Sequence, residues 1–134
     1  MGRPPDAMSM HEELPAAPAS VGAARRLLRR FAGDLGVDVD AVELAVSEAV
    51  ANAVVHAYED DRGTVELEAA AAPYELQIVV RDHGCGMGGN GSDGGAGFGL
   101  PIIRRLARHV EVADARPGVT LTMTFPRGGR WAEA

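Results

Sequence analysis

The chain contains no lysine, because all thirteen of its basic residues are arginine. Two phosphate-binding devices are therefore excluded: the P-loop with its lysine, and the lysine that protein kinases of the eukaryotic type carry on a strand. A net charge of −6 also leaves no basic field of the kind that neutralises a nucleic-acid backbone. We expect neither a P-loop enzyme nor a direct nucleic-acid partner.

Cysteine occurs once, as Cys85, which excludes a disulfide framework and a multi-cysteine zinc site. No segment approaches the roughly 20 apolar residues of a spanning helix, and the first residues lack the apolar region of a signal peptide. These absences predict a cytoplasmic protein without a membrane partner. Aromatic residues are scarce at 4%, yet 46% of the 134 residues are hydrophobic, enough for the core of one domain.

Proline and periodicity divide the chain. Residues 1–18 contain four prolines and little periodicity, so we predict a flexible leader outside the core, a single domain over residues 19–127 and a tail over 128–134. Within the domain, helices are expected over 20–33, 38–58 and 99–110, and strands over 64–71, 74–82, 110–115 and 119–125. This order favours an α+β fold, a two-layer sandwich whose mixed sheet is covered on one face by helices.

The second predicted helix carries a polar stripe. Glu48, Asn52 and His56 follow one another at i, i+4 and i+8 on a helix that is otherwise largely apolar. Residues at this spacing share a face, and buried polar groups need partners, so the stripe suggests the wall of a polar pocket. The alternative is that the stripe is simply the solvent-exposed face of the helix.

Nine of the seventeen glycines lie between positions 84 and 99, after Asp82 ends an apolar strand and before a helix begins. Glycine allows backbone N–H groups to approach an anion closely, and the start of a helix adds free donors and a favourable dipole. Such a loop can hold phosphates without lysine. A flexible linker explains the acidic strand end less well, and a Rossmann glycine motif is rejected because no helix opens at Gly89.

Three segments, "SEAVANAVVHAY", "RDHGCGM" and "GAGFGLPII", resemble the N box, the D-x-G-x-G box and the G-x-G lid hinge of the GHKL superfamily of ATP-binding domains. They occur in the order seen in that superfamily, whose architecture is the Bergerat fold. Within it, the chain is most similar to the anti-sigma-factor serine kinases of bacterial partner-switching systems. The resemblance covers about residues 40–125.

The resemblance implies a role for each matched residue. Glu48 would be the general base, Asn52 a ligand of Mg²⁺ and Asp82 the acceptor that reads the amino group of adenine. Further contacts to ATP are implied at Gly84, Gly86, Gly95, Gly97, Gly99, Leu100 and Thr120.

The resemblance also implies partners and an activity. The protein would sequester a sigma factor and use ATP to phosphorylate a serine on an anti-anti-sigma antagonist with a STAS domain, and dimerisation is suggested by the resemblance alone. An alternative is a nucleotide-responsive binding module with little kinase activity. A histidine-kinase catalytic domain with His11 as phosphoacceptor is disfavoured, because prolines surround that histidine instead of a long helical hairpin.

Two departures from the family pattern concern the phosphates and the last box. Ala96 stands where the family often has an arginine, which leaves the source of phosphate-neutralising charge open; Arg104 or Arg105 could supply it from the next helix. The final Gly-Thr box is interrupted, since Val119 separates Gly118 from Thr120.

Overall fold

The computed structural model describes residues 8–57, 63–83, 100–114 and 118–128. These residues form five strands and three α-helices, with a π-helical segment, η1, after the second helix. In chain order the elements are β1 Met8–Pro15, α1 Ala19–Ala32, α2 Val39–Asn52, η1 Ala53–Ala57, β2 Thr64–Ala71, β3 Glu75–Asp82, α3 Leu100–Leu106, β4 His109–Asp114 and β5 Val119–Pro126. The predicted order of helices and strands is confirmed, with one strand added at the beginning.

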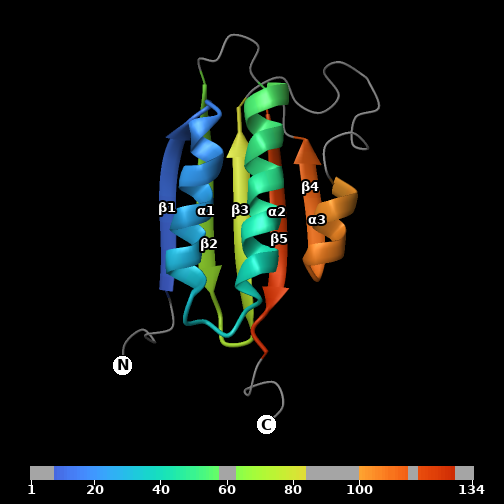
Figure 1. Cartoon of the computed structure of the whole chain (residues 1–134). Helices are drawn as coiled ribbons and strands as arrows, with labels where there is room; N and C mark the ends of the chain where they lie inside the picture. Colours follow the sequence, from blue (N-terminus) through green and yellow to red (C-terminus); the bar gives the residue numbers. More distant parts are fainter. Residues whose placement is uncertain (1–7, 58–62, 84–99, 115–117, 129–134) are drawn as a thin grey trace, which may run out of the picture.

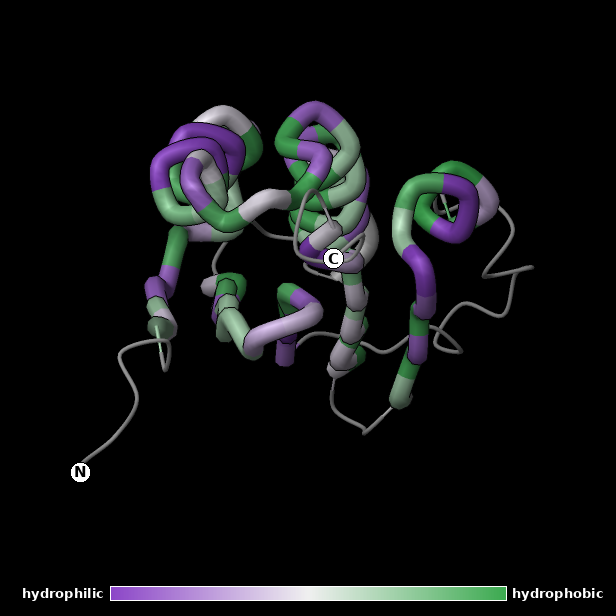
Figure 2. The backbone as a smooth tube through the Cα atoms, turned by 90° about the horizontal axis from the view of Figure 1, so that it is seen from below, coloured by the Kyte–Doolittle hydropathy of each residue, from purple (hydrophilic) through white to green (hydrophobic). Residues whose placement is uncertain are grey.

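The elements form two layers. The strands make one sheet in the order β1-β2-β3-β5-β4, and the helices lie on one face of it (Figures 1 and 2). The α+β two-layer fold is therefore confirmed, but the sheet is not mixed, because every strand pair among the described residues is antiparallel. β2 pairs with β3 and β4 with β5, its neighbours in the chain, whereas β3 pairs with β5 across a connection that contains α3 and β4.

Alternation along the strands separates the two faces of the sheet. On β3, Leu76, Ile78 and Val80 are buried against the helices, while Gln77 and Val79 point to the opposite side. The same period of two runs along β2 and β5. The core therefore lies between the sheet and the helices, and the other face of the sheet, called here the open face, carries most of the polar side chains of the strands.

The expectation of a flexible leader is wrong for Met8–Pro15. These residues form the edge strand β1, paired with β2 from Met8↔Ala71 to Pro15↔Thr64. Met10 and Leu14 pack against the core. The pattern was concealed because polar residues fill most other positions of the strand, an arrangement that an edge strand tolerates, and because Pro15 stands at its end, where no ladder hydrogen bond is lost.

Helix α2 begins where the sequence indicated. The Asp38 side chain accepts a hydrogen bond from the Ala41 backbone N–H at 3.1 Å, which caps the first turn. The helix is apolar on the side of the sheet, where Val42, Val46 and Val50 are fully buried. No helix in the described part of the chain is long and apolar enough to cross a membrane.

Candidate active site at the end of α2 and β3

Glu48 and Asn52 lie one turn apart on the last two turns of α2. Both are partly buried, while Ala49 and Val50 between them are buried in the core. A spacing of four residues places the two side chains on the same face of the helix. The polar stripe is therefore neither fully exposed nor part of the apolar core, as the edge of a pocket requires.

The stripe does not continue to His56 with α-helical geometry. After Asn52 the backbone widens into the π-helical segment Ala53–Ala57, so the 100° per residue that aligned His56 with Asn52 no longer applies. Short π segments are rare and occur often at functional sites. The side chain of His56 lies outside the described residues.

Asp82 is the last residue of β3 and is only 8% exposed. It continues the alternation of Ile78 and Val80, so its carboxylate lies on the side of the sheet that faces the helices. A buried carboxylate at a strand end is unusual, because aspartate side chains are mostly exposed in folded proteins. A carboxylate in this buried position is better suited to accept a hydrogen bond from a bound ligand than to act as a solvent-exposed charge.

The structure brings these residues to one end of the domain. The C-terminal part of α2 and the end of β3 lie at the same end in Figure 1, and η1 contacts β3 directly. The segments that carry Glu48, Asn52 and Asp82 therefore lie at the same end of the domain. The chain leaves β3 there toward the glycine-rich segment.

The glycines of that segment, Gly84, Gly86, Gly95, Gly97 and Gly99, lie outside the described residues, as does Ala96. Leu100 is the first residue of α3 and is partly buried against the core. Arg104 and Arg105 lie in the last turn of α3 and are exposed. Their side chains are not packed in the core, so they are accessible to a phosphate group.

Thr120 is not brought together with Asp82. It pairs with Arg81 across the β3–β5 ladder, and residues directly opposite one another in an antiparallel pair point to the same face. Arg81 points to the open face, so Thr120 does so too. Val119, the preceding residue of β5, alternates with Thr120 and is partly buried.

Gly118 was noted in the sequence only as part of an interrupted box, but it contacts the strand that carries Asp82. Its φ is +101°, and a Cβ built on it would lie 2.0 Å from the Asp82 carbonyl oxygen. In the sequence, Gly118 is visible only as a glycine directly before a strand rich in β-branched residues. This pattern does not show that Asp82 is the residue it contacts.

The open face of the sheet carries a charged cluster. Arg81 Nη1 lies 2.9 Å from Glu66 Oε1 and 3.3 Å from Glu68 Oε2, and His11 Nε2 lies 3.6 Å from Glu66 Oε2. The hydrogen bond donated by Arg81 lowers the pKa of the Glu66 carboxyl despite its partial burial. The same bond raises the pKa of Arg81.

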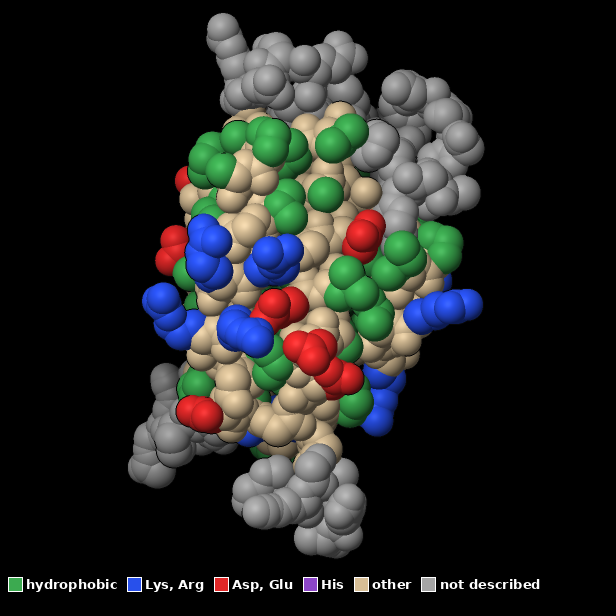
Figure 3. Space-filling view, in the orientation of Figure 1, with side chains coloured by type: hydrophobic (Ala, Val, Ile, Leu, Met, Phe, Trp, Pro, Cys, Tyr) green, Lys and Arg blue, Asp and Glu red, His purple; other side chains and the backbone are tan. Residues whose placement is uncertain are grey.

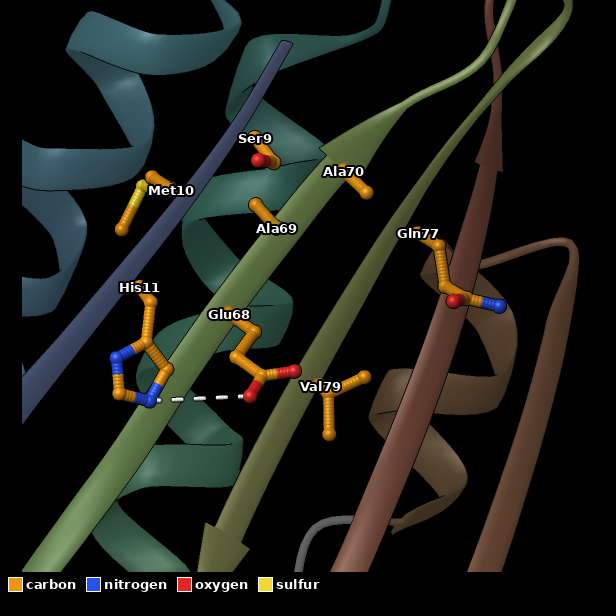
Figure 4. Close-up of a pocket in the computed structure, with 8 residues that line it drawn as sticks. All are labelled: Ser9, Met10, His11, Glu68, Ala69, Ala70, Gln77 and Val79. Carbon is orange, nitrogen blue, oxygen red and sulfur yellow. Dashed lines mark ion pairs between the residues drawn. The ribbon is translucent and has the colours of Figure 1, made fainter. Parts of the chain in front are cut away.

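A hollow of about 350 Å³ lies beside this cluster, lined by Ser9, Met10, His11, Glu68, Ala69, Ala70, Gln77 and Val79 (Figure 4). His11 and Glu68 face each other within it, with 3.7 Å between Nε2 and Oε2. Glu68 and Gln77 are on the open face, whereas Asp82 is on the helix side. The hollow is therefore separate from the candidate active site.

The donor set suits a nucleotide-bound cation rather than a metal held by the protein alone. Across the described residues no group of three or more His, Cys, Asp or Glu side chains could hold a metal ion. Mg²⁺ binds through few protein oxygens and completes its octahedron with substrate phosphates and water. The amide oxygen of Asn52, partly buried beside Glu48, fits such a single protein ligand.

Helix α1 presents a basic surface on the helix-covered side of the molecule. Arg25, Arg26, Arg29 and Arg30 are exposed, and Figure 3 shows basic side chains gathered over α1 beside acidic ones. Arg29 donates a hydrogen bond to Glu43 of α2. The helix is thus amphipathic as predicted, with Ala24, Leu28 and Ala32 fully buried on its other face.

Comparison with known proteins agrees with this arrangement. Residues 14–125 match the family described as the histidine kinase-like ATPase domain. The chain is 31% identical over 133 residues to the serine-protein kinase RsbW of Bacillus velezensis, covering 84% of this chain and 81% of that protein. It is 42% identical over 67 residues to the anti-sigma F factor of Clostridium acetobutylicum, covering 48% of this chain and 47% of that protein.

A solved structure is similar as well. The crystal structure of the RsbU and RsbW domains of a Mycobacterium tuberculosis protein superposes with a TM-score of 0.70 at 26% identity, covering 90% of this chain and 32% of that one. The matches to the anti-sigma F factors span about half the length of those relatives or less. The family match covers most of this chain, including Glu48, Asn52 and Asp82, and the chain therefore belongs to the histidine kinase-like ATPase domain family.

Proposed function

We propose that this protein is an ATP-dependent anti-sigma factor and serine kinase, which binds a sigma factor and phosphorylates a serine on an anti-anti-sigma antagonist with a STAS domain. The observation that carries the proposal is that Glu48 and Asn52 lie in the last turns of α2, that the buried Asp82 ends β3, and that these two element ends lie at the same end of the domain. The names of the relatives, serine-protein kinase RsbW and anti-sigma F factor, support the kinase activity and the sigma-factor partner, whereas the anti-anti-sigma antagonist is implied by the sequence resemblance alone.

Asp82 reads the base. Its carboxylate accepts hydrogen bonds only, so it suits the amino group of adenine and repels the carbonyl oxygen that guanine presents at the same position. Burial strengthens this discrimination, because a mismatched acceptor pair in a site with little water leaves both groups without a donor. ATP is therefore the nucleotide we assign.

Glu48 and Asn52 act on the phosphates of ATP. Mg²⁺ bound with ATP supplies charge neutralisation for phosphoryl transfer. Asn52 holds the cation through its amide oxygen, and Glu48, one turn earlier, accepts the proton of the attacking serine hydroxyl. A carboxylate in partly buried surroundings can be held close to one hydroxyl, which an exposed side chain cannot achieve as reliably.

Arginine replaces lysine at the phosphates. Arg104 and Arg105 are exposed on α3, the helix that directly follows the glycine-rich segment, and we assign one of them to the neutralisation of phosphate charge. The glycine backbone between positions 84 and 99 supplies N–H donors. A cytoplasmic location and a homodimer complete the proposal, and light scattering of the purified chain tests the second.

The decisive experiment is transfer of labelled γ-phosphate to the cognate antagonist. The wild-type protein with Mg²⁺ and γ-labelled ATP should label the antagonist on serine. Glu48→Gln should bind ATP with similar affinity but transfer phosphate at least about a hundredfold more slowly, as loss of a general base predicts. Asp40→Asn, on the exposed first turn of the same helix, is the matched control and should retain full activity.

Two results would change the conclusion. An antagonist that stays unlabelled, while ATP still alters its binding to the protein, makes the chain a nucleotide-responsive binding module. The replacement of the family's arginine by Ala96 is the sequence feature that favours this second candidate. A wild-type chain with no affinity for ATP would refute both functions.

A further inference from the structure

Gly118 makes the closest backbone approach to Asp82 that the structure shows for any described glycine. A Cβ at position 118 would lie 2.0 Å from the Asp82 carbonyl oxygen, 2.8 Å from its carbonyl carbon and 2.8 Å from the His83 Cα. Real Cβ atoms essentially never approach other atoms to less than 3.0 Å. The three neighbours are all backbone atoms, so no rotation of a side chain can make room.

The backbone conformation at position 118 also requires a residue without a Cβ. The φ of Gly118 is +101°, in the region that residues with a Cβ rarely adopt. Gly118 directly precedes β5, and the atoms nearest to its built Cβ belong to Asp82 and His83. Gly118 therefore lies against the peptide that joins Asp82 to His83, at the point where β3 ends.

We infer that Gly118 is a positioning residue for the adenine-reading carboxylate of Asp82. This inference rests on the proposed ATP-binding function. The end of β3 is restrained on one side by its pairing with β2, where Val65 lies opposite Asp82. On the other side Gly118 is the contact, so the place of the Asp82 backbone is set between two strands.

Adding a methyl group at position 118 should displace this peptide. Either β5 begins further from β3, or the Asp82–His83 peptide moves away, and both movements shift the Cα from which the Asp82 side chain extends. That side chain is 8% exposed, so closely packed surroundings prevent it from rotating to recover its place. A hydrogen bond to adenine is sensitive to such a shift, because its strength falls steeply outside a narrow range of distance and angle.

Gly118→Ala should affect the residues proposed to act on the phosphates, Glu48 and Asn52, much less than Asp82. Glu48 and Asn52 are carried by α2, which does not contain the displaced peptide. The expected signature is therefore a loss of base selectivity with little change in phosphoryl transfer. A general loss of structure would lower both together.

Gly36 provides a matched control. It also has a positive φ, +79°, but a Cβ there would meet nothing within 4 Å. Gly36 lies between α1 and α2, and its carbonyl oxygen accepts the Gly128 N–H. Gly36→Ala thus introduces the same unfavourable backbone conformation without the collision, so the difference between the two variants isolates the contact with Asp82.

The experiment measures ATP and GTP affinity by calorimetry for the wild type, Gly118→Ala, Gly36→Ala and Asp82→Ala, together with phosphoryl transfer at saturating ATP. Gly118→Ala should weaken ATP binding about tenfold or more without weakening GTP binding equally, as for a misplaced charged hydrogen-bond acceptor. Its rate at saturating ATP should stay within about threefold of wild type. Asp82→Ala marks full loss of selectivity, and Gly36→Ala should keep wild-type selectivity.

Several outcomes would overturn the inference. One is an unchanged ratio of ATP to GTP affinity in Gly118→Ala while Asp82→Ala loses it. Another is a loss of selectivity for ATP over GTP in Gly36→Ala that equals the loss in Gly118→Ala. If Gly118→Ala is unfolded by circular dichroism, the measurement is repeated in a stabilising osmolyte, and failure to fold there too makes Gly118 a folding determinant instead. A wild-type chain that binds no ATP refutes the proposed function itself, which is a separate result.

Discussion

Arg81 of β3 donates a hydrogen bond to Glu66 of β2, with 2.9 Å between Nη1 and Oε1, on the open face of the sheet. Arg81 directly precedes Asp82, yet the two side chains point to opposite faces because successive residues of a strand alternate. The arginine nearest in sequence to Asp82, the residue proposed to bind adenine, therefore pairs on the other face of the sheet. It cannot neutralise the phosphates, and it cannot compensate the charge of Asp82 directly.

The Arg81–Glu66 pair should make stability depend on pH. Glu66→Gln should lower the free energy of unfolding by about 1 kcal/mol near neutral pH, since the pair is partly exposed. The pKa of Glu66 is lowered in the folded state, so this contribution is present above the carboxyl's unfolded pKa and is lost as the pH falls through the folded value. Urea unfolding between about pH 8 and about pH 3 measures it.

His11 and His83 also face Glu66, with 3.6 Å and 3.9 Å between their Nε2 atoms and its carboxylate oxygens, so Glu66→Gln alters these contacts together with the one to Arg81. Glu75→Gln, which changes an exposed carboxylate on the neighbouring strand β3, serves as the control. A difference between Glu66→Gln and wild type that persists undiminished at the acid end would contradict the prediction.

Asn52 should be required for magnesium-dependent binding but not for folding. Asn52→Ala should weaken the affinity for ATP in the presence of Mg²⁺ about tenfold or more, and much less when Mg²⁺ is chelated, if its amide oxygen binds the cation as proposed. Calorimetric titrations with and without the metal provide the measurement. Gln77→Ala removes an amide from the open face and should leave both affinities unchanged. Global unfolding of Asn52→Ala would return the residue to a structural role.

Thr120 should not contribute to ATP binding. The resemblance assigned it to the nucleotide site, but its pairing with Arg81 turns it to the open face. Thr120→Val keeps the shape of the side chain and removes the hydroxyl, so ATP affinity should change by less than about twofold. The same titration tests it. A larger loss of affinity would show that the hydroxyl reaches the nucleotide and that the resemblance is the better guide.

Arg127 should stabilise the end of the domain opposite the active site. Its Nε donates to the Leu35 carbonyl oxygen at 2.8 Å and its Nη1 to that of Ala72 at 2.6 Å. One side chain thus joins the end of β5 to the α1–α2 connection and to the β2–β3 turn. Arg127→Ala should lower the free energy of unfolding by about 2 kcal/mol, within the range for hydrogen bonds from charged groups.

Urea denaturation with Arg30→Ala, an exposed arginine on α1, as the control is the appropriate measurement. Equal effects of the two substitutions would mean that the bonds of Arg127 contribute nothing beyond the loss of one surface charge. ATP affinity should be unchanged in both variants.

The sequence by itself was sufficient for the elements whose signals are local. Alternation identified β2 and β3 almost to the residue, and Asp38 marked the start of α2 because a side-chain oxygen at that position can cap the first turn. The candidate residues on α2 followed from helical spacing. These features depend on residues a few positions apart, so their physical cause is contained in a short stretch of chain.

Only the tertiary structure decided which distant residues meet. The strand Met8–Pro15 becomes regular because β2 offers it an unpaired edge, and the direction of Thr120 follows from its register with β3 rather than from its neighbours in the chain. The contact between Gly118 and Asp82 joins positions 36 residues apart in sequence. Pairing and register are set by burial across the whole sheet, and no short segment contains that information.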